Sequence, residues 1–123
     1  MSHIVSIRTE VRDREAVLRA CRRLEIPEPV EGEAKVFTNW KKGLLLRLKD
    51  WEFPVVCDLA SGRVEYDNYE GHWGDVDRLM TFLQIYAVEK ATLEARKRGH
   101  SVVEQPLADG SIKLVIGVAG EAR

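Results

Sequence analysis

The segment Tyr66–Gly74 (YDNYEGHWG) holds the densest group of side chains that could perform chemistry. As an active site it would use His72 as a general base, with the phenol of Tyr69 beside it. Glu70 or Asp67 would be the acid that orients the imidazole. The segment contains no evident nucleophile, and its aromatic rings could instead pack over the core edge while its acids cap the next helix. Both interpretations stay open at this stage.

Metal and cofactor chemistry has no signature in this sequence. The histidines His3, His72 and His100 are scattered, and Cys21 and Cys57 form no C-x-x-C pair. A Gly-rich phosphate loop, a G-x-S-x-G elbow and a dinucleotide fingerprint are all missing. We therefore expect no metal and no cofactor, and we expect both thiols to be reduced and buried.

Charged side chains are unevenly distributed although the net charge is only −1. Residues 1–49 carry 11 basic and 7 acidic side chains, whereas residues 50–77 carry one basic and eight acidic. An arginine face on the first predicted helix would suit phosphate or an acidic partner, unless it is simply solvated. Its members are Arg12, Arg19, Arg22 and Arg23. The acidic middle opposes nucleic-acid binding, whereas opposite poles of two copies could attract each other and separate at high salt.

Length and composition predict one globular domain at residues 1–118, followed by a short tail at 119–123. The chain has 123 residues, of which 45% are hydrophobic and 32% charged. These values are typical of a protein with a packed core rather than of a disordered chain. No run of about 18 apolar residues and no signal peptide is evident, so we expect a cytoplasmic protein without a membrane partner.

Hydrophobic periodicity predicts nine elements in the order β-α-β-β-β-β-α-β-β. The predicted ranges are 3–11, 14–24, 33–39, 42–49, 53–59, 63–67, 76–98, 101–107 and 111–118. Asp13 and Asp75 are placed to cap the two helices, and Gly99 is placed to end the second. Hairpins combined with two helices favour an α+β fold, with a mostly antiparallel sheet and both helices packed on one face.

Two turn signals set the expected strand registers. A two-residue turn at Ser61–Gly62 would place Asp58 opposite Glu65, so either the register slips by one residue or a cation such as Arg47 or Lys49 lies nearby. A two-residue turn at residues 109–110 would place six side chains on one face of the last hairpin. They are Val103, Gln105, Leu107, Ile112, Leu114 and Ile116.

Three separated segments carry a family resemblance. They are the opening Met1–Ile4 with Ile7-x-Thr9, the helix segment Gln84–Ala87, and Gly99-x-Ser101-x-x-Glu104 with Asp109–Leu114. Together they resemble the small hypothetical chloroplast reading-frame family numbered thirty-five, also called domain of unknown function twelve fifty-seven. That family occurs in cyanobacteria, algal plastids and other bacteria. The resemblance implies a cytosolic setting and no established activity.

The resemblance also marks Ser2, His3, Tyr86, Glu104 and Gly110 as motif positions. A turn accounts for Gly110, whereas no element accounts fully for Tyr86 or Glu104. We predict that these two side chains and His3 meet in a polar binding site where the sheet joins a helix.

The favoured function is a non-enzymatic module that binds an unknown protein or a second copy of itself, for example as a dimer. Trp73, with Trp40 and Trp51, would provide an aromatic contact surface or would cap the core margin. One alternative is a small enzyme or ligand-binding protein that uses the loop 66–74. Another is a weak nucleic-acid binder that uses the arginine face of residues 8–23, although nucleic acid is the less expected partner.

Overall fold

A computed structural model describes residues 5–7, 10–36 and 39–118, with the side chains of 5–7 outside the description. The predicted element order is confirmed, and a short 3-10 turn, η1 (Tyr69–Gly71), is added to it. The helices are α1 (Arg14–Arg23) and α2 (Val76–Lys97). The strands are β1 (Val5–Ile7), β2 (Val30–Val36), β3 (Asn39–Leu46), β4 (Val55–Asp58), β5 (Arg63–Tyr66), β6 (Ser101–Pro106) and β7 (Ile112–Gly117).

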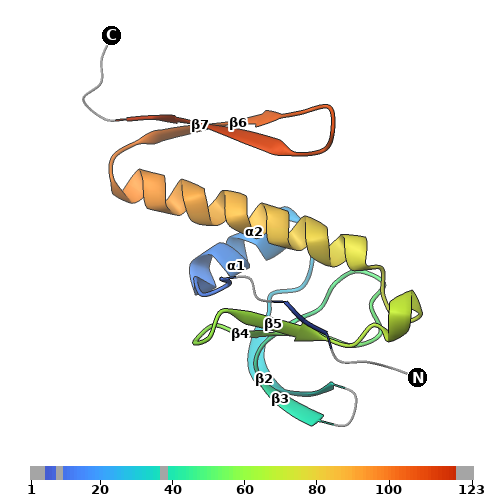
Figure 1. The fold of residues 1–123 in the computed structure, drawn as a ribbon. Coiled ribbons are helices and arrows are strands. Elements are labelled where there is room, and N and C mark those ends of the chain that lie inside the picture. Colours follow the sequence, from blue (N-terminus) through green and yellow to red (C-terminus); the bar gives the residue numbers. More distant parts are fainter. Residues whose placement is uncertain (1–4, 8–9, 37–38, 119–123) are drawn as a thin grey trace.

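The α+β fold has three layers rather than two. Five antiparallel strands form one sheet in the order β1-β5-β4-β3-β2, and α1 and α2 cover one of its faces (Figure 1). The strands β6 and β7 form a separate two-stranded sheet on the opposite side of α2 (Figure 1). The longest helix therefore lies between two sheets. The main core covers one side of α2, and the hairpin β6–β7 covers the other side.

The main core lies between the two helices and the five-stranded sheet. From α1 it takes Ala16, Val17, Ala20 and Cys21, which recur at helical spacing. From α2 it takes Leu79, Phe82, Ile85, Tyr86 and Leu93, and from β3 to β5 it takes Leu44, Leu46, Val55, Cys57, Val64 and Tyr66. Among the described residues, no helix combines the length and the apolar character needed to cross a membrane.

The helix ends follow the sequence prediction. Asp13 accepts a hydrogen bond from the backbone N–H of Ala16, and Asp75 accepts one from that of Asp77. At the other end of α2, Gly99 adopts a φ of 78°, the left-handed conformation that glycine takes with the least strain. Both helices are therefore delimited by local interactions.

The register predicted for β4 and β5 is wrong by two residues. Asp58 lies opposite Arg63 rather than Glu65, so an unlike pair replaces the like-charged one. The reason lies in the turn, where the Asp58 carboxylate accepts hydrogen bonds from Ala60 N (3.1 Å) and Ser61 Oγ (2.9 Å). These bonds organise a four-residue loop. A cation does lie near Glu65, namely Lys41 at 3.6 Å, whereas Arg47 and Lys49 form no ion pair with another described residue.

The register predicted for the last hairpin is wrong by one residue. Val103 lies opposite Val115, and Leu107 N donates to Ser111 O across a loop of three residues. Gly110 has a φ of 91° and takes the left-handed position of this loop, as three-residue hairpin loops require. The six side chains that were predicted to share one face are therefore divided between two faces.

Gly43 allows the backbones of β3 and β4 to approach each other unusually closely. It lies on β3 opposite Gly32 of β2, in a register that continues without a bulge. A Cβ atom at Gly43 would lie 2.6 Å from the carbonyl oxygen of Cys57 on β4, which is closer than real Cβ contacts. A Cβ atom at Gly32 would meet only the Leu45 side chain, at 3.3 Å.

We predict that Gly43→Ala lowers the free energy of unfolding by about 1–3 kcal/mol, because backbone atoms of β4 must move to admit the methyl group. Gly32→Ala is the matched control and should change it by less than about 1 kcal/mol, because the Leu45 side chain can turn away. Urea denaturation measures both variants, and equal losses in the two would contradict the explanation.

Candidate functional site

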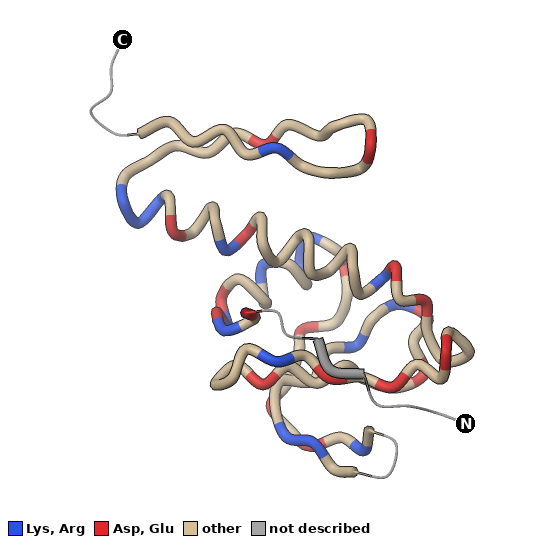
Figure 2. Tube along the Cα trace, in the orientation of Figure 1, with Lys and Arg blue, Asp and Glu red and all other residues tan. Residues whose placement is uncertain are grey.

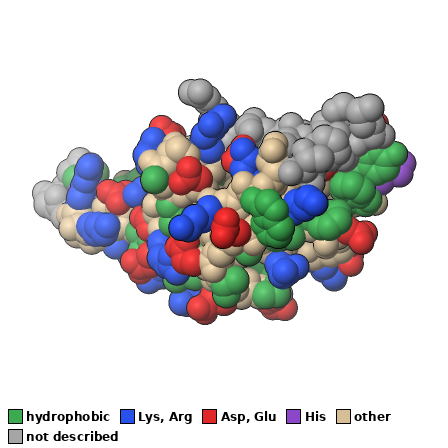
Figure 3. Space-filling model, turned by 90° about the horizontal axis from the view of Figure 1, so that it is seen from below, with side chains coloured by type: hydrophobic (Ala, Val, Ile, Leu, Met, Phe, Trp, Pro, Cys, Tyr) green, Lys and Arg blue, Asp and Glu red, His purple; other side chains and the backbone are tan. Residues whose placement is uncertain are grey.

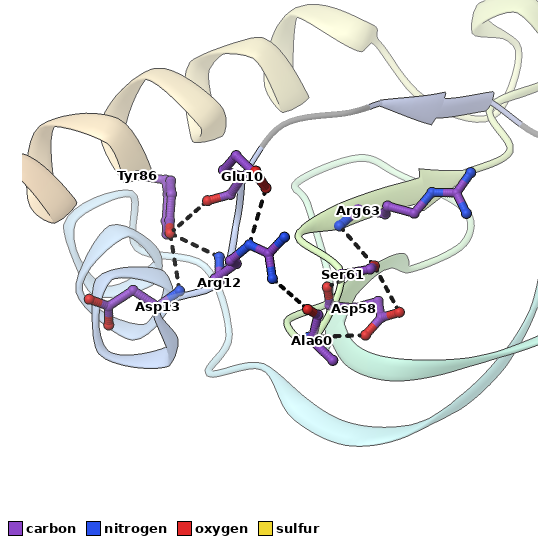
Figure 4. Close-up of polar contacts among 8 residues, drawn as sticks. All are labelled: Glu10, Arg12, Asp13, Asp58, Ala60, Ser61, Arg63 and Tyr86. Carbon is purple, nitrogen blue, oxygen red and sulfur yellow. Dashed lines mark hydrogen bonds and ion pairs between the residues drawn. The ribbon is translucent and has the colours of Figure 1, made fainter.

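Tyr86 joins α2 to the segment that leads into α1. Its hydroxyl oxygen accepts hydrogen bonds from the backbone N–H groups of Arg12 and Asp13, both at 3.1 Å, and donates to the carbonyl oxygen of Glu10 at 3.3 Å (Figure 4). The side chain is buried. The hydroxyl thus provides hydrogen-bond partners for backbone groups at the start of α1. This structural role accounts for Tyr86, which the family resemblance marked as a motif position.

Arg12 is exposed, but its guanidinium is engaged in contacts within the chain. Its Nε lies 3.1 Å from Glu10 Oε2, and its terminal nitrogen donates to the carbonyl oxygen of Ala60 at 2.6 Å (Figure 4). Val11 N also donates to Gly62 O in the same turn. These bonds fasten the segment before α1 to the turn between β4 and β5.

Arg23 clamps the last hairpin to the two helices. Its guanidinium makes two hydrogen bonds with the Glu104 carboxylate of β6, at 2.6 and 2.8 Å, and one with Glu89 of α2 at 3.1 Å. Hydrogen bonding to Arg23 holds the pKa of Glu104 below its usual value. The geometry is the paired fork typical of strong arginine–carboxylate contacts.

The remaining arginines of the predicted face leave little positive charge for a partner. Arg19 pairs with Glu15 one helical turn away, and the neighbouring Arg14, which is not a member of that face, pairs with Glu31. Arg22 is exposed and is the member without an ion pair in the described part of the chain. Carboxylates of the same chain therefore compensate most of the charge of these arginines.

The three residues of the predicted polar site do not form one described network. The Tyr86 hydroxyl lies with the backbone of residues 10–13, and Glu104 lies with Arg23. His3 falls outside the described residues. Tyr86 and Glu104 therefore have separate structural partners, and a site that adds His3 to them stays a prediction.

The loop that follows β5 is held in a strained conformation. Tyr69 and Glu70 are consecutive residues with positive φ angles of 47° and 53°. The buried Asp67 accepts a bond from Tyr69 N through Oδ1, and the Asn68 amide donates to Gly74 O. The Oδ2 atom of Asp67 is buried and has no hydrogen-bond partner in the described structure. Short-range polar contacts thus fix this loop in place.

His72 is oriented by a carbonyl oxygen and not by the predicted carboxylates. Its Nδ1 lies 2.8 Å from the backbone oxygen of Tyr69, which can only accept, so Nδ1 carries the proton and Nε2 is left as the possible base. The imidazole also stacks on the Tyr69 ring at 4.6 Å. Glu70 is exposed. Of the catalytic candidates, the fold brings His72 and Tyr69 together.

Two segments contribute to a row of aromatic rings beside this loop. Trp73 lies 5.0 Å from Phe53 and 5.0 Å from Tyr69 between ring centroids. The contact depends on a backbone hydrogen bond of 2.8 Å from Glu52 N to Trp73 O. Sequence reasoning identified Trp73 but missed Phe53 and Glu52, because nothing local shows that residues 52–53 lie beside residue 73.

Two hollows lie away from the His72 loop. One, of about 100 Å³, is lined by Leu24, Ile26, Leu48, Lys49, Arg78 and Thr81. The other, of about 310 Å³, is lined by Glu31, Lys42, Gly43, Leu44, Cys57, Asp58, Leu59 and Ala60. Neither contains His72, Tyr69 or Glu70, the residues that an enzymatic pocket was predicted to contain.

The environment of both cysteine thiols lowers their reactivity. Cys21 and Cys57 are free and buried, and burial raises their pKa values to about 11 and about 12. Both are therefore protonated at neutral pH and are poor nucleophiles. The described part of the chain contains no group of three His, Cys, Asp or Glu side chains that could hold a metal ion.

Comparison of the chain with models of protein families, with curated proteins and with solved structures found no match. The family resemblance carried by three segments of the sequence therefore stays a prediction.

We predict that Tyr86→Phe lowers the free energy of unfolding by about 1–3 kcal/mol, because buried backbone groups lose their partner. Tyr69→Phe is the matched control, since the Tyr69 hydroxyl makes no hydrogen bond among the described residues, and it should cost less than about 0.5 kcal/mol. Urea denaturation compares the two. A stable Tyr86→Phe variant would show that the hydroxyl does not anchor α2.

We predict that the clamp on the last hairpin weakens in acid. Because the pKa of Glu104 lies below its ordinary value of 4.5 in the folded protein, the stabilisation is complete above that pH and is lost as the pH falls below it. At neutral pH, Glu104→Gln should speed amide hydrogen exchange in β6 and β7 about fivefold, a value that allows for solvent screening of this partly exposed pair. Glu15→Gln should leave it unchanged, and equal exchange in both variants would rule out the clamp.

Proposed function

We propose that this protein is a non-enzymatic, self-associating module in which the hairpin β6–β7 docks on the hairpin of a second copy. The observation that carries the proposal is the outer face of this hairpin. Val103 and Val115 are paired across the two strands, on the face turned away from α2, and are 59% and 46% exposed. Large exposed apolar surfaces are typical of interaction sites.

Exposed apolar side chains are concentrated in this part of the described chain. Of the described residues, ten large hydrophobic side chains are exposed, and half of them belong to the hairpin and its ends. These are Val103, Leu107, Val115, Ile116 and Val118. An isolated two-stranded sheet is marginally stable in water, so a second layer on its open face would stabilise it.

The side chains on the outer face of the hairpin β6–β7 are compatible with packing against the same face of a second copy. Along the two strands the outward positions are Ser101, Val103, Gln105, Lys113, Val115 and Gly117. Lys113 is the single charge among them, so two such faces can meet about a two-fold axis with little like-charge repulsion. The valine pair would lie at the centre of that contact.

The proposed dimer does not depend on attraction between the basic segment 1–49 of one copy and the acidic segment 50–77 of the other. Four of the five described arginines between residues 12 and 23 form internal ion pairs. An association through the valine face should therefore persist or strengthen as salt is raised, whereas a pole-to-pole contact would weaken.

The test is sedimentation across a range of protein concentrations at low and high salt. We expect Val103→Lys to raise the dissociation constant of the dimer at least tenfold, because two buried valines are replaced by two charges across the two-fold axis. Val30→Lys is the matched control, since Val30 lies on β2 and is 60% exposed. Circular dichroism checks that both variants are folded. A monomeric wild type, or equal effects of the two substitutions, would overturn the proposal.

A further inference from the structure

A second surface lies at the other side of the molecule, where the loop after β5 meets the loop after β3. Its rings are Phe53, Tyr69 and Trp73, with Glu52 and Glu70 next to them in the chain; we call this set the aromatic–acidic surface. Phe53 is 41% exposed, and Tyr69 and Trp73 are partly exposed. Figure 3 shows hydrophobic side chains gathered beside a histidine at one end of this face of the molecule.

The aromatic–acidic surface is held in a defined shape before any partner binds. Trp73 N donates to Asn68 O at 2.9 Å, and Trp73 O accepts from Glu52 N at 2.8 Å. Beneath them, Gly74 lies against Trp51 so closely that a Cβ atom would come within 2.3 Å of the indole. The Trp51 Nε1 group donates to Asp75 O at 3.0 Å. A surface that is already ordered loses little entropy on binding.

The charge around these rings is negative and available to a partner. Glu52, Glu70 and Asp77 are exposed, and none forms an ion pair in the described part of the chain. The carboxylate of Asp50 lies 3.7 Å from the guanidinium of Arg78. The negative charges of Glu52, Glu70 and Asp77 are left without such a partner among the described residues. Figure 2 shows acidic positions grouped where η1 leads into α2. The basic face of α1 is largely neutralised by internal ion pairs, whereas this acidic region is not.

Aromatic rings bordered by unpaired carboxylates have a defined binding preference. The faces of tryptophan, tyrosine and phenylalanine attract ammonium and guanidinium groups, and the carboxylates add a long-range attraction of the same sign. The same charges repel the phosphates of nucleic acids and of anionic lipids. We infer that the aromatic–acidic surface binds a lysine- or arginine-rich segment of a partner protein, with one cationic side chain seated on the rings.

This inference concerns a different surface from the hairpin, which lies across α2 from the five-stranded sheet (Figure 1). It therefore does not depend on self-association. If the hairpin proposal fails, the protein is a monomer that still binds a basic segment through its aromatic end.

The experiment is a calorimetric titration of the full chain with a twelve-residue peptide of alternating arginine and serine. We expect binding that weakens with salt. Phe53→Leu should raise the dissociation constant about two- to fivefold, because the side chain keeps its apolar character but loses its ring. Glu70→Gln should raise it by a similar factor. Both positions are exposed, so both variants are expected to fold.

Glu28→Gln is the matched control, because it removes the same charge from an exposed loop on another part of the chain. It should leave the dissociation constant within about 1.5-fold of the wild type. If Glu28→Gln and Glu70→Gln weakened peptide binding equally, the net charge of the protein would explain the effect, and the inference would be overturned. Failure of the arginine peptide to bind at millimolar concentration would overturn it, as would tighter binding of a single-stranded oligonucleotide. Loss of self-association in Phe53→Leu would make the occupant a second copy and would also overturn it.

Discussion

The burial of α2 on two sides is the constraint on which the rest of the structure depends. One side carries Leu79, Phe82 and Tyr86 into the core with α1 and the sheet. The other side receives the hairpin, whose Ile112 packs against that core and whose Gly110 O accepts from Gln84. A helix with apolar residues around much of its circumference needs cover from two directions. The three layers follow from this requirement.

Polar contacts then define how the layers are placed on one another. Apolar packing alone tolerates small shifts, whereas hydrogen bonds are directional and are costly to leave unmade when buried. Tyr86 sets α2 against the start of α1, and Arg23 sets the hairpin against both helices. Arg12 extends the same arrangement to the turn between β4 and β5. Much of the charge that appears in the sequence as a possible binding face is therefore used for internal assembly.

The distribution of ion pairs changes the meaning of the charge pattern. Residues 1–49 and 50–77 have opposite charge balances, and from the sequence they appear equally open to a partner. In the structure four of the five arginines between residues 12 and 23 are paired with carboxylates, whereas Glu52, Glu70 and Asp77 remain exposed. The acidic end therefore presents exposed negative charge, and it carries the aromatic rings. The hairpin offers a second and almost uncharged surface.

The sequence by itself determined the element order, the helix caps at Asp13 and Asp75, the left-handed end at Gly99 and the burial of both cysteines. Each of these depends on neighbouring residues or on a short periodic pattern. The two hairpin registers were not determined, because the Asp58 carboxylate and the left-handed Gly110 each allow a longer loop than the shortest one. Only the tertiary structure decided the separate position of β6–β7, the partners of Tyr86 and the pairing of Arg23 with Glu104, 81 residues away. Those contacts depend on how distant segments pack, and local sequence patterns carry no information about such distances.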